Sequence, residues 1–184
     1  SFDRNSYDSG DWFNYVDWSG ATTGMGRGVP PGDDNRDMWL LIRPMLTDPL
    51  MAPGPEDLAF SSAVFREWLA IRAQEPLFRL RTAEDVMARL TFHNTGPYQV
   101  PGVIVMQLRD DLPGVPDLSA DVDRLLVVFN ASPNRATVTV PEAAGKAWLL
   151  HDVQANGVDA DNLRGAFVAT ANGRVAVPPL SVVV

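Results

Sequence analysis

Short runs of hydrophobic residues, separated by turns rich in Pro, Gly and Asn, fill the chain after residue 77. Residues 103–106 (VIVM) and 125–129 (LLVVF) are apolar throughout, as in central strands that are covered on both faces. Residues 137–140 (TVTV) alternate, as in a strand with one face in water. Several short strands at such spacing predict a mainly β fold, an antiparallel β-sandwich. The expected strands are 87–93, 102–109, 124–131, 136–140, 147–151, 166–171, 174–177 and 180–184.

The strongest turn signal in this β region is the pair Asn172-Gly173. An Asn-Gly pair favours a type I′ turn, because both central residues of that turn have a positive φ. We therefore expect the strands on either side of this pair to form a hairpin.

One long helix is predicted before the strands, over residues 56–75. Pro55 suits the first helical position, and Glu56 and Asp57 favour the positive end of the helix dipole. Pro76 ends the pattern. Two adjacent apolar stripes cover about half of the circumference, which is wider than the usual single stripe, so we expect partners on two sides. The stripes consist of Phe60, Val64, Trp68 and Ile71, and of Leu58, Phe65 and Leu69.

The first 55 residues are rich in Asp, Asn, Gly, Pro and aromatic residues, a composition that is typical of loops. Three of the five tryptophans, Trp12, Trp18 and Trp39, lie in this arm. Because disordered segments are poor in aromatic residues, we expect an ordered loop that is held against other parts of the protein. A short helix is expected over about residues 35–46, with Pro44 disturbing its end.

The charge balance bears on the partners of the chain. Asp and Glu together number 23 and Lys and Arg 15, which gives a formal net charge of −8. A nucleic acid or an anionic membrane would require a basic face, so we expect neither as a partner. The chain has no Cys, which excludes disulfides and thiolate metal sites. The two histidines, His93 and His151, are far apart in the sequence and are expected to be structural.

Four motifs, in the same order and at matching separations, resemble pullulanases and limit dextrinases, which are debranching enzymes of the α-amylase superfamily of glycoside hydrolases. The resemblance covers essentially the whole chain and weakens after about residue 110. The motifs are residues 1–14 (SFDRNSYDSGDWFN), 28–31 (GVPP), 75–80 (EPLFRL), and 92–97 (FHNTGP) followed by 101–106 (PGVIVM).

The resemblance implies a place for each part of the chain. Residues 1–76 correspond to the terminal loop and last helix of a catalytic (β/α)₈ barrel, on the face where the active sites of such barrels lie. Residues 77–184 correspond to a C-terminal all-β sandwich domain. The implied activity of the intact enzyme is hydrolysis of α-1,6-glucosidic bonds in starch, glycogen or pullulan. Its implied partners are an α-glucan and the rest of the barrel.

The resemblance also implies that this chain is not catalytic. Enzymes of this kind use one carboxylate as nucleophile and a second as acid, and in the family both come from earlier barrel strands. The acidic cluster Asp33, Asp34 and Asp37 could suggest a catalytic pair, but a solvated acidic loop before a helix is the better interpretation.

Sugar-binding residues can be carried over by motif. Arg4 matches an arginine that lies beside the donor-side sugars in the family, and Asp37 matches an acidic residue of the same region. The alternatives are an ion pair of Arg4 with a nearby Asp of the loop, and helix capping by Asp37. Trp12, Trp39 and Phe13 are candidate stacking platforms, with burial as supports of the loop as the alternative.

No cofactor is expected, with one conceivable exception. Asp8, Ser9, Asp11 and Asn14 offer oxygen ligands, which calcium prefers, although their spacing matches no EF-hand. Two other classes of function stay open at this point: a free-standing carbohydrate-binding module and a purely structural domain. The long arm and the helix with two apolar stripes favour the debranching-enzyme interpretation, because an independent module should not begin with a barrel loop.

Overall fold

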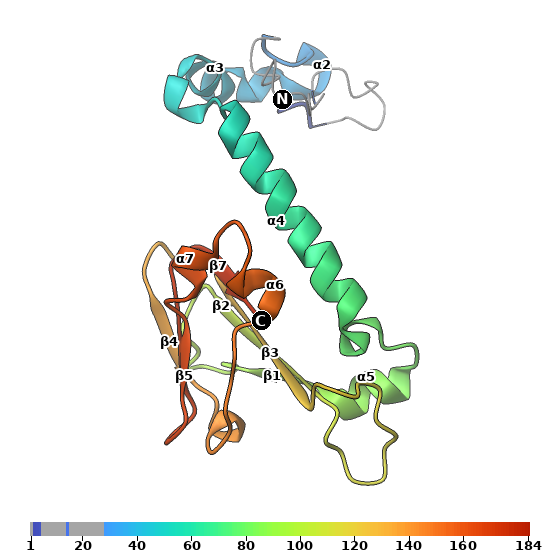
Figure 1. Ribbon diagram of the computed structural model, residues 1–184. Coiled ribbons are helices and arrows are strands. Elements are labelled where there is room, and N and C mark those ends of the chain that lie inside the picture. The colour runs from blue at the N-terminus through green and yellow to red at the C-terminus, as the bar shows by residue number, and fades with distance from the viewer. Residues whose placement is uncertain (1, 5–13, 15–27) are drawn as a thin grey trace. The chain divides into compact units, whose positions relative to one another are not determined.

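The computed structural model describes residues 2–4, 14 and 28–184. The chain divides into two compact units, Ser1–Ala63 and Val64–Val184, which are described separately (Figure 1). The expected domain boundary between residues 76 and 77 stays a prediction.

Most of residues 32–51 in the first unit are helical. α2 (Gly32–Asn35) continues into η3 (Arg36–Met38) and α3 (Trp39–Thr47), and a single turn, η4 (Pro49–Met51), follows. This succession replaces the one short helix expected over residues 35–46. Pro44 lies inside α3, which ends three residues later.

The long helix α4 (Pro55–Gln74) confirms the prediction for residues 56–75. Pro55 is its first residue, and the Gly54 N–H donates to Asp57 Oδ2 at 2.8 Å. The helix begins in the first unit and ends in the second, where Ile71 is buried. The turn η5 (Pro76–Arg79) follows it.

The second unit holds two antiparallel sheets, as the alternation of the sequence predicted (Figure 1). One sheet has the order β1-β2-β3-β7, and the other has the order β4-β6-β5. The strands of the first sheet are β1 (Leu90–His93), β2 (Val103–Arg109), β3 (Arg124–Asn130) and β7 (Ser181–Val183). Those of the second sheet are β4 (Ala136–Thr139), β5 (Phe167–Ala169) and β6 (Arg174–Val177).

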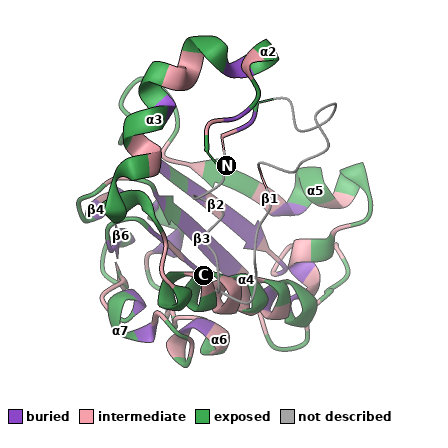
Figure 2. Cartoon of the chain, turned by 90° about the horizontal axis from the view of Figure 1, so that it is seen from above, coloured by how far each residue is buried: buried purple, intermediate pink, exposed green. Residues whose placement is uncertain are grey.

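The main core consists of valines and leucines that the two sheets share, and Figure 2 shows the buried residues along β2 and β3. Val105 and Val128 of the first sheet belong to the same cluster as Val138 and Val175 of the second. Leu77, Leu108 and Leu125 form a second, smaller cluster.

The expectation that β2 and β3 are covered on both faces is only partly correct. Ile104 and Phe129 are opposite each other in the register, and they are 55% and 38% exposed. One part of this sheet face is therefore apolar and open to solvent in the described structure.

One predicted strand, over residues 87–93, begins too early, because β1 covers only Leu90–His93, and another predicted strand is wrong. Residues 87–89 belong to helix α5 (Ala83–Arg89), because Thr82 caps its start: the Asp85 N–H donates to Thr82 Oγ1 at 3.1 Å. The buried Arg89 at the end of this helix forms an ion pair with Asp110. Residues 147–151 form no strand.

The predicted hairpin is confirmed, since β5 pairs with β6, but the turn is not of type I′. Only Gly173 has a positive φ, at 65°, and Asn172 does not. The Gly173 carbonyl accepts a hydrogen bond from the Val140 N–H at 2.9 Å, which brings two backbone segments close together.

The remaining elements are short: η6 (Pro141–Ala143), α6 (Asp152–Ala155) and α7 (Ala160–Leu163). Within the described ranges, no helix has both the length and the hydropathy needed to cross a bilayer.

Candidate functional site

Two of the predicted sugar-binding residues, Arg4 and Asp37, lie together in the first unit. Arg4 Nη2 is 2.6 Å from Asp37 Oδ1, and Arg4 Nη1 donates to Asp37 Oδ2 at 3.3 Å. Both side chains are exposed, at 50% and 67%. The pair therefore presents a bidentate guanidinium–carboxylate fork to solvent, and the polar atoms that the fork leaves unused can reach a ligand.

A buried amide holds the backbone beneath this fork. Asn35 is 1% exposed, and its Oδ1 accepts a hydrogen bond from the Arg4 N–H at 3.0 Å. Its Nδ2 donates to Asp3 Oδ1 at 3.0 Å and to Pro31 O at 2.9 Å. Asn35 thus connects the segment of Arg4 with the double-proline loop.

A second amide supports the same segment. The Asp3 N–H donates to Asn14 Oδ1 at 3.1 Å, and Asn14 Nδ2 donates back to Asp3 O at 2.8 Å. The guanidinium of Arg4 also donates to the carbonyl of Asp34. Sequence analysis did not identify Asn35, because an Asn after a loop with two Asp residues looks like one more solvated residue.

The guanidinium also sets the electrostatics of the fork. The hydrogen bond from Arg4 holds the pKa of Asp37 below its ordinary value. Asp37 is therefore a carboxylate, and an acceptor only, at neutral pH. Among the described residues an ion pair joins Arg4 to Asp37. Two of the alternative partners in its own loop, Asp8 and Asp11, lie outside the described residues.

Trp39 lies close to the double-proline loop. Its Nε1–H donates to Pro30 O at 2.9 Å, and a Cβ at Gly32 would come within 3.2 Å of the indole. The guanidinium groups of Arg36 and Arg43 lie over the ring, 5.6 and 5.4 Å from its centroid. This arrangement makes Trp39 a support for the loop, and its use as a stacking platform stays a prediction.

Several predicted residues fall outside the described residues. These are the stacking candidates Trp12 and Phe13 and the calcium candidates Asp8, Ser9 and Asp11. The fourth calcium candidate, Asn14, uses its amide on Asp3. In residues 2–4, 14 and 28–184, no group of three or more His, Asp or Glu residues could hold a metal ion.

The family model described as "Alpha-1,6-glucosidases, pullulanase-type, C-terminal" matches residues 20–184. The chain belongs to this family. The match includes Asp37, Trp39 and the whole β region, and Arg4 lies before its first residue.

Two curated relatives of this pullulanase-type domain are pullulanases. The chain is 38% identical over 182 residues to "Pullulanase 1, chloroplastic" of Arabidopsis thaliana, which covers 93% of this chain and 19% of the relative. It is 35% identical over 185 residues to "Pullulanase" of Klebsiella pneumoniae, which covers 100% of this chain and 16% of the relative. The chain therefore spans less than a fifth of the length of either relative.

Solved pullulanase structures share the fold. PulA from Klebsiella oxytoca superposes with a TM-score of 0.84 at 33% identity, over 100% of this chain and 17% of that chain. The maltotriose complex of PulA from Klebsiella pneumoniae gives a TM-score of 0.84 at 36% identity, over 100% of this chain and 19% of that chain. The antiparallel β fold of the pullulanase-type domain agrees with the prediction from its sequence.

Proposed function

We propose that this chain is the C-terminal part of an enzyme that hydrolyses α-1,6-glucosidic bonds in a branched α-glucan. In this proposal the catalytic carboxylates belong to other parts of the enzyme. The chain contributes sugar contacts through Arg4 and Asp37, and it stabilises the catalytic barrel. The observation that carries the proposal is the exposed Arg4–Asp37 fork above the buried Asn35.

The chemistry of the fork suits a sugar. Neighbouring hydroxyl groups of a pyranose can donate to a carboxylate and accept from a guanidinium, and hydrogen bonds to charged groups are stronger than neutral ones. Because Asn35 fixes the backbone of Arg4 before any ligand arrives, less conformational entropy is lost on binding. The maltotriose complex of a relative supports an α-glucan as the ligand class.

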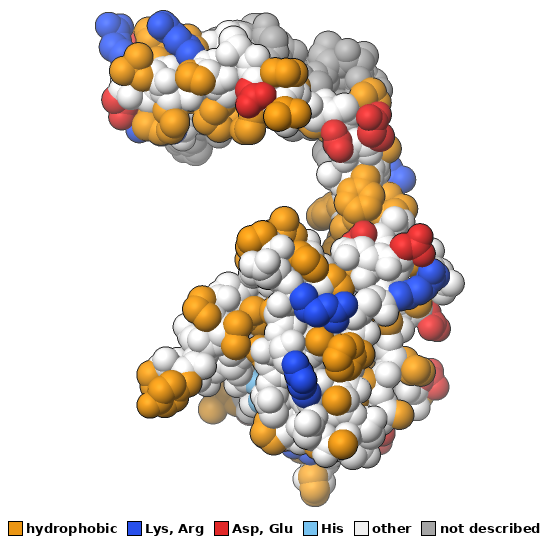
Figure 3. Space-filling model, turned by 90° about the vertical axis from the view of Figure 1, so that its left-hand side faces the viewer, with side chains coloured by type: hydrophobic (Ala, Val, Ile, Leu, Met, Phe, Trp, Pro, Cys, Tyr) orange, Lys and Arg blue, Asp and Glu red, His pale blue; other side chains and the backbone are white. Residues whose placement is uncertain are grey.

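The proposed partner is the catalytic barrel. Helix α4 leaves Phe60, Phe65 and Leu69 exposed, at 45%, 62% and 51%. Hydrophobic side chains reach the surface along this helix (Figure 3). Apolar side chains that recur along one helix are typical of a surface that another domain covers, which agrees with the two-sided packing expected for this helix.

The test uses the complete enzyme that contains this chain. Arg4→Ala and Asp37→Ala should each lower kcat/KM on a long branched dextrin by roughly ten- to a hundredfold, since a hydrogen bond to a charged group is worth about 1.5–3 kcal/mol. The loss should be smaller on a short substrate that does not reach these residues. Asp33→Ala, an exposed acidic neighbour in α2, is the control and should leave both substrates unaffected.

The competing outcome is a purely structural role. In that case Arg4→Ala and Asp37→Ala would lower the melting temperature, while kcat/KM at low temperature would be unchanged on long and short substrates alike. That result would remove both residues from the substrate-binding surface.

A further inference from the structure

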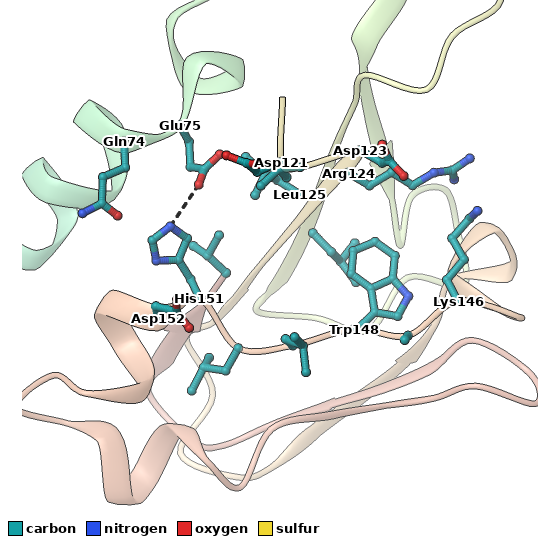
Figure 4. Close-up of a pocket in the computed structure, with 16 residues that line it drawn as sticks. Gln74, Glu75, Asp121, Asp123, Arg124, Leu125, Lys146, Trp148, His151 and Asp152 are labelled. Atoms are coloured by element: carbon teal, nitrogen blue, oxygen red, sulfur yellow. Dashed lines mark hydrogen bonds and ion pairs between the residues drawn. The ribbon is translucent and has the colours of Figure 1, made fainter. Parts of the chain in front are cut away.

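The second unit contains a cavity of about 700 Å³ that the proposed function does not use (Figure 4). Its walls are the residues that end α4, the first residues of β3 and the segment 146–152. The volume lies within the range of roughly 300–1,000 Å³ that is usual for small-molecule sites.

The sheet topology explains why the space is open. β7 pairs with β3 only at residues 128–130, so residues 124–127 have no strand on that side among the described residues. The segment 147–151, which the sequence predicted as a strand, does not pair with β3. At its end, the His151 N–H donates instead to Val184 O at 2.9 Å.

One carboxylate oxygen in the wall lacks a hydrogen-bond partner among the described residues. The side chains of Glu75 and His151 are each 10% exposed, and His151 Nε2 lies 3.2 Å from Glu75 Oε1. His151 Nδ1 accepts a hydrogen bond from the Val153 N–H at 3.2 Å, so the neutral imidazole carries its proton on Nε2 and donates to Glu75. Glu75 Oε2 is buried and has no hydrogen-bond partner in the described part of the chain. A buried, unsatisfied carboxylate oxygen requires a donor.

An aromatic ring lines the same cavity. Trp148 faces it in Figure 4 and is fixed by a hydrogen bond from its Nε1–H to Ala143 O, at 3.0 Å. Asp121 and Asp123 add carboxylates on the β3 side, and Lys146 adds an ammonium group to the lining of the cavity. The site therefore combines a flat apolar surface with groups that bind hydroxyls. One of these groups is a buried carboxylate oxygen to which no described residue donates.

We propose that this cavity is a second α-glucan site, separate from the Arg4–Asp37 fork, which binds a short malto-oligosaccharide. A sugar hydroxyl donates to Glu75 Oε2, and a pyranose ring packs on the indole of Trp148. The choice of an α-glucan over other polyols rests on the proposed function. The site is not catalytic, and it provides the domain with a second place at which to bind a branched α-glucan.

The cavity can be tested with the 184-residue chain itself. Addition of maltotriose to the ¹⁵N-labelled protein should shift the indole N–H resonance of Trp148 and the backbone amides of residues 147–152. Cellotriose, which has the same hydroxyls on a β-linked chain, should shift them less. The absence of shifts at these positions, or shifts confined to the loop near Trp39, would overturn the proposal and would leave the proposed function intact.

A matched pair of variants tests the role of Glu75. Glu75→Gln keeps an oxygen that accepts from His151 but removes the free carboxylate oxygen, so the Kd for maltotriose should rise by about tenfold or more. Glu142→Gln makes the same change at a half-exposed carboxylate 3.6 Å from His93 Nδ1, and should leave the Kd unchanged. An equal Kd in all three proteins would contradict the proposal.

A cationic ligand is the competing occupant, because acidic side chains outnumber basic ones in this wall. L-arginine amide is the probe for it. If that amine moves the Trp148 resonance and maltotriose does not, the cavity is a cation site and the proposal fails. The mapping with the unaltered chain decides between the two even if Glu75→Gln does not fold.

Discussion

Arg4 and Asp37 are 33 residues apart in the sequence, and their contact shows what a motif can and cannot reveal. The resemblance selected both residues for the same region of a bound sugar, but it did not predict that they bind each other. In the sequence, the acidic residues nearest to Arg4 are those of its own loop, and they are the partners that a local pattern suggests. The ion pair with Asp37 requires the double-proline loop to lie close to Arg4. Asn35 holds the two segments together, because its side chain hydrogen-bonds the backbone of both Arg4 and Pro31.

The first prediction at this scale concerns the protonation of Asp37. Removing the guanidinium in Arg4→Ala should raise the pKa of Asp37 toward its ordinary value, because the hydrogen bond from Arg4 is the largest cause of its lowering. A carboxyl ¹³C titration of both proteins measures this directly. Identical titration curves would show that the fork does not persist in solution.

The same shift has a consequence for stability. A lowered pKa means that the native state binds fewer protons than the unfolded state near pH 4, so stability rises with pH there. The contribution of the pair is present above about pH 4 and disappears as the pH falls through the lowered pKa. Because both groups are exposed, the effect should be small and should decrease further in salt.

A second prediction concerns Asn35. Asn35→Ala removes one accepted and two donated hydrogen bonds at a side chain that is 1% exposed, and it should cost about 2–4 kcal/mol of stability. Urea unfolding followed by circular dichroism measures the loss. Asp33→Ala in the same helix should change stability by less than about 1 kcal/mol. If the two variants unfolded at the same urea concentration, Asn35 would not be the anchor.

At the scale of elements, hydrophobic patterning located most strands, and it failed where local interactions favoured another structure. Met87 and Ala88 are apolar residues close to the start of β1, but the Thr82 cap and the buried ion pair of Arg89 favour a helix over residues 87–89. The ion pair joins residues 21 apart, which no local pattern reveals. Residues 147–151 form a short apolar run that would suit a strand, yet they pair with no strand among the described residues, and nothing in their own sequence predicts this lack of pairing.

Asp110 illustrates how one such contact organises a loop. Besides its ion pair with Arg89, its Oδ2 accepts hydrogen bonds from the backbone N–H groups of Leu118 and Ser119, at 2.8 and 2.7 Å. Arg89 also donates to the carbonyl of Pro116. The chain between β2 and β3 is thus held by one buried pair, although its own residues carry only the composition of a loop.

The prediction at this scale concerns the β5–β6 turn. A Cβ at Gly173 would lie 2.0 Å from Val140 O, and its φ is 65°, so Gly173→Ala combines a backbone clash with an unfavourable conformation. Gly145 has a similar φ of 73°, but a Cβ added there would meet no heavy atom within 4 Å. Gly145→Ala therefore measures the cost of the positive φ alone. Gly145→Ala should lower the free energy of unfolding by about 1–2 kcal/mol, and Gly173→Ala should lower it by about 1–3 kcal/mol more. Thermal unfolding of the two variants provides the comparison, and equal losses would show that the close approach to Val140 is absent.

At the scale of the whole molecule, the antiparallel β fold followed from the sequence because short apolar or alternating runs recur between turns rich in Pro, Gly and Asn. The distribution of exposed apolar residues did not follow from it. The two stripes of α4 predicted burial on two sides, and in the described structure Ile71 is buried while Phe60, Phe65 and Leu69 are exposed. Among the described residues, the apolar stripes of this helix are therefore only partly buried.

The last prediction follows from this incomplete cover. A helix with apolar side chains in contact with water should bind a hydrophobic dye and promote self-association of the isolated chain. Leu69→Lys places a charge in the exposed stripe of α4, where Leu69 is 51% exposed, and should reduce dye binding and shift the chain toward monomer. Dye fluorescence and sedimentation velocity over a range of concentrations measure both effects.

The matched control is Leu50→Lys, at an exposed leucine of η4 outside the helix, where Leu50 is 92% exposed. If Leu50→Lys and Leu69→Lys reduced dye binding and self-association equally, these properties would depend on exposed leucines in general and not on the stripe of α4. An unaltered chain that is monomeric at every concentration and binds no dye would contradict the assignment of α4 as a helix that another domain covers. A specific loss with Leu69→Lys would locate the docking surface on α4. In the complete enzyme, where the proposed barrel covers this helix, the same substitution should lower the melting temperature, since a charge would then be buried without a partner.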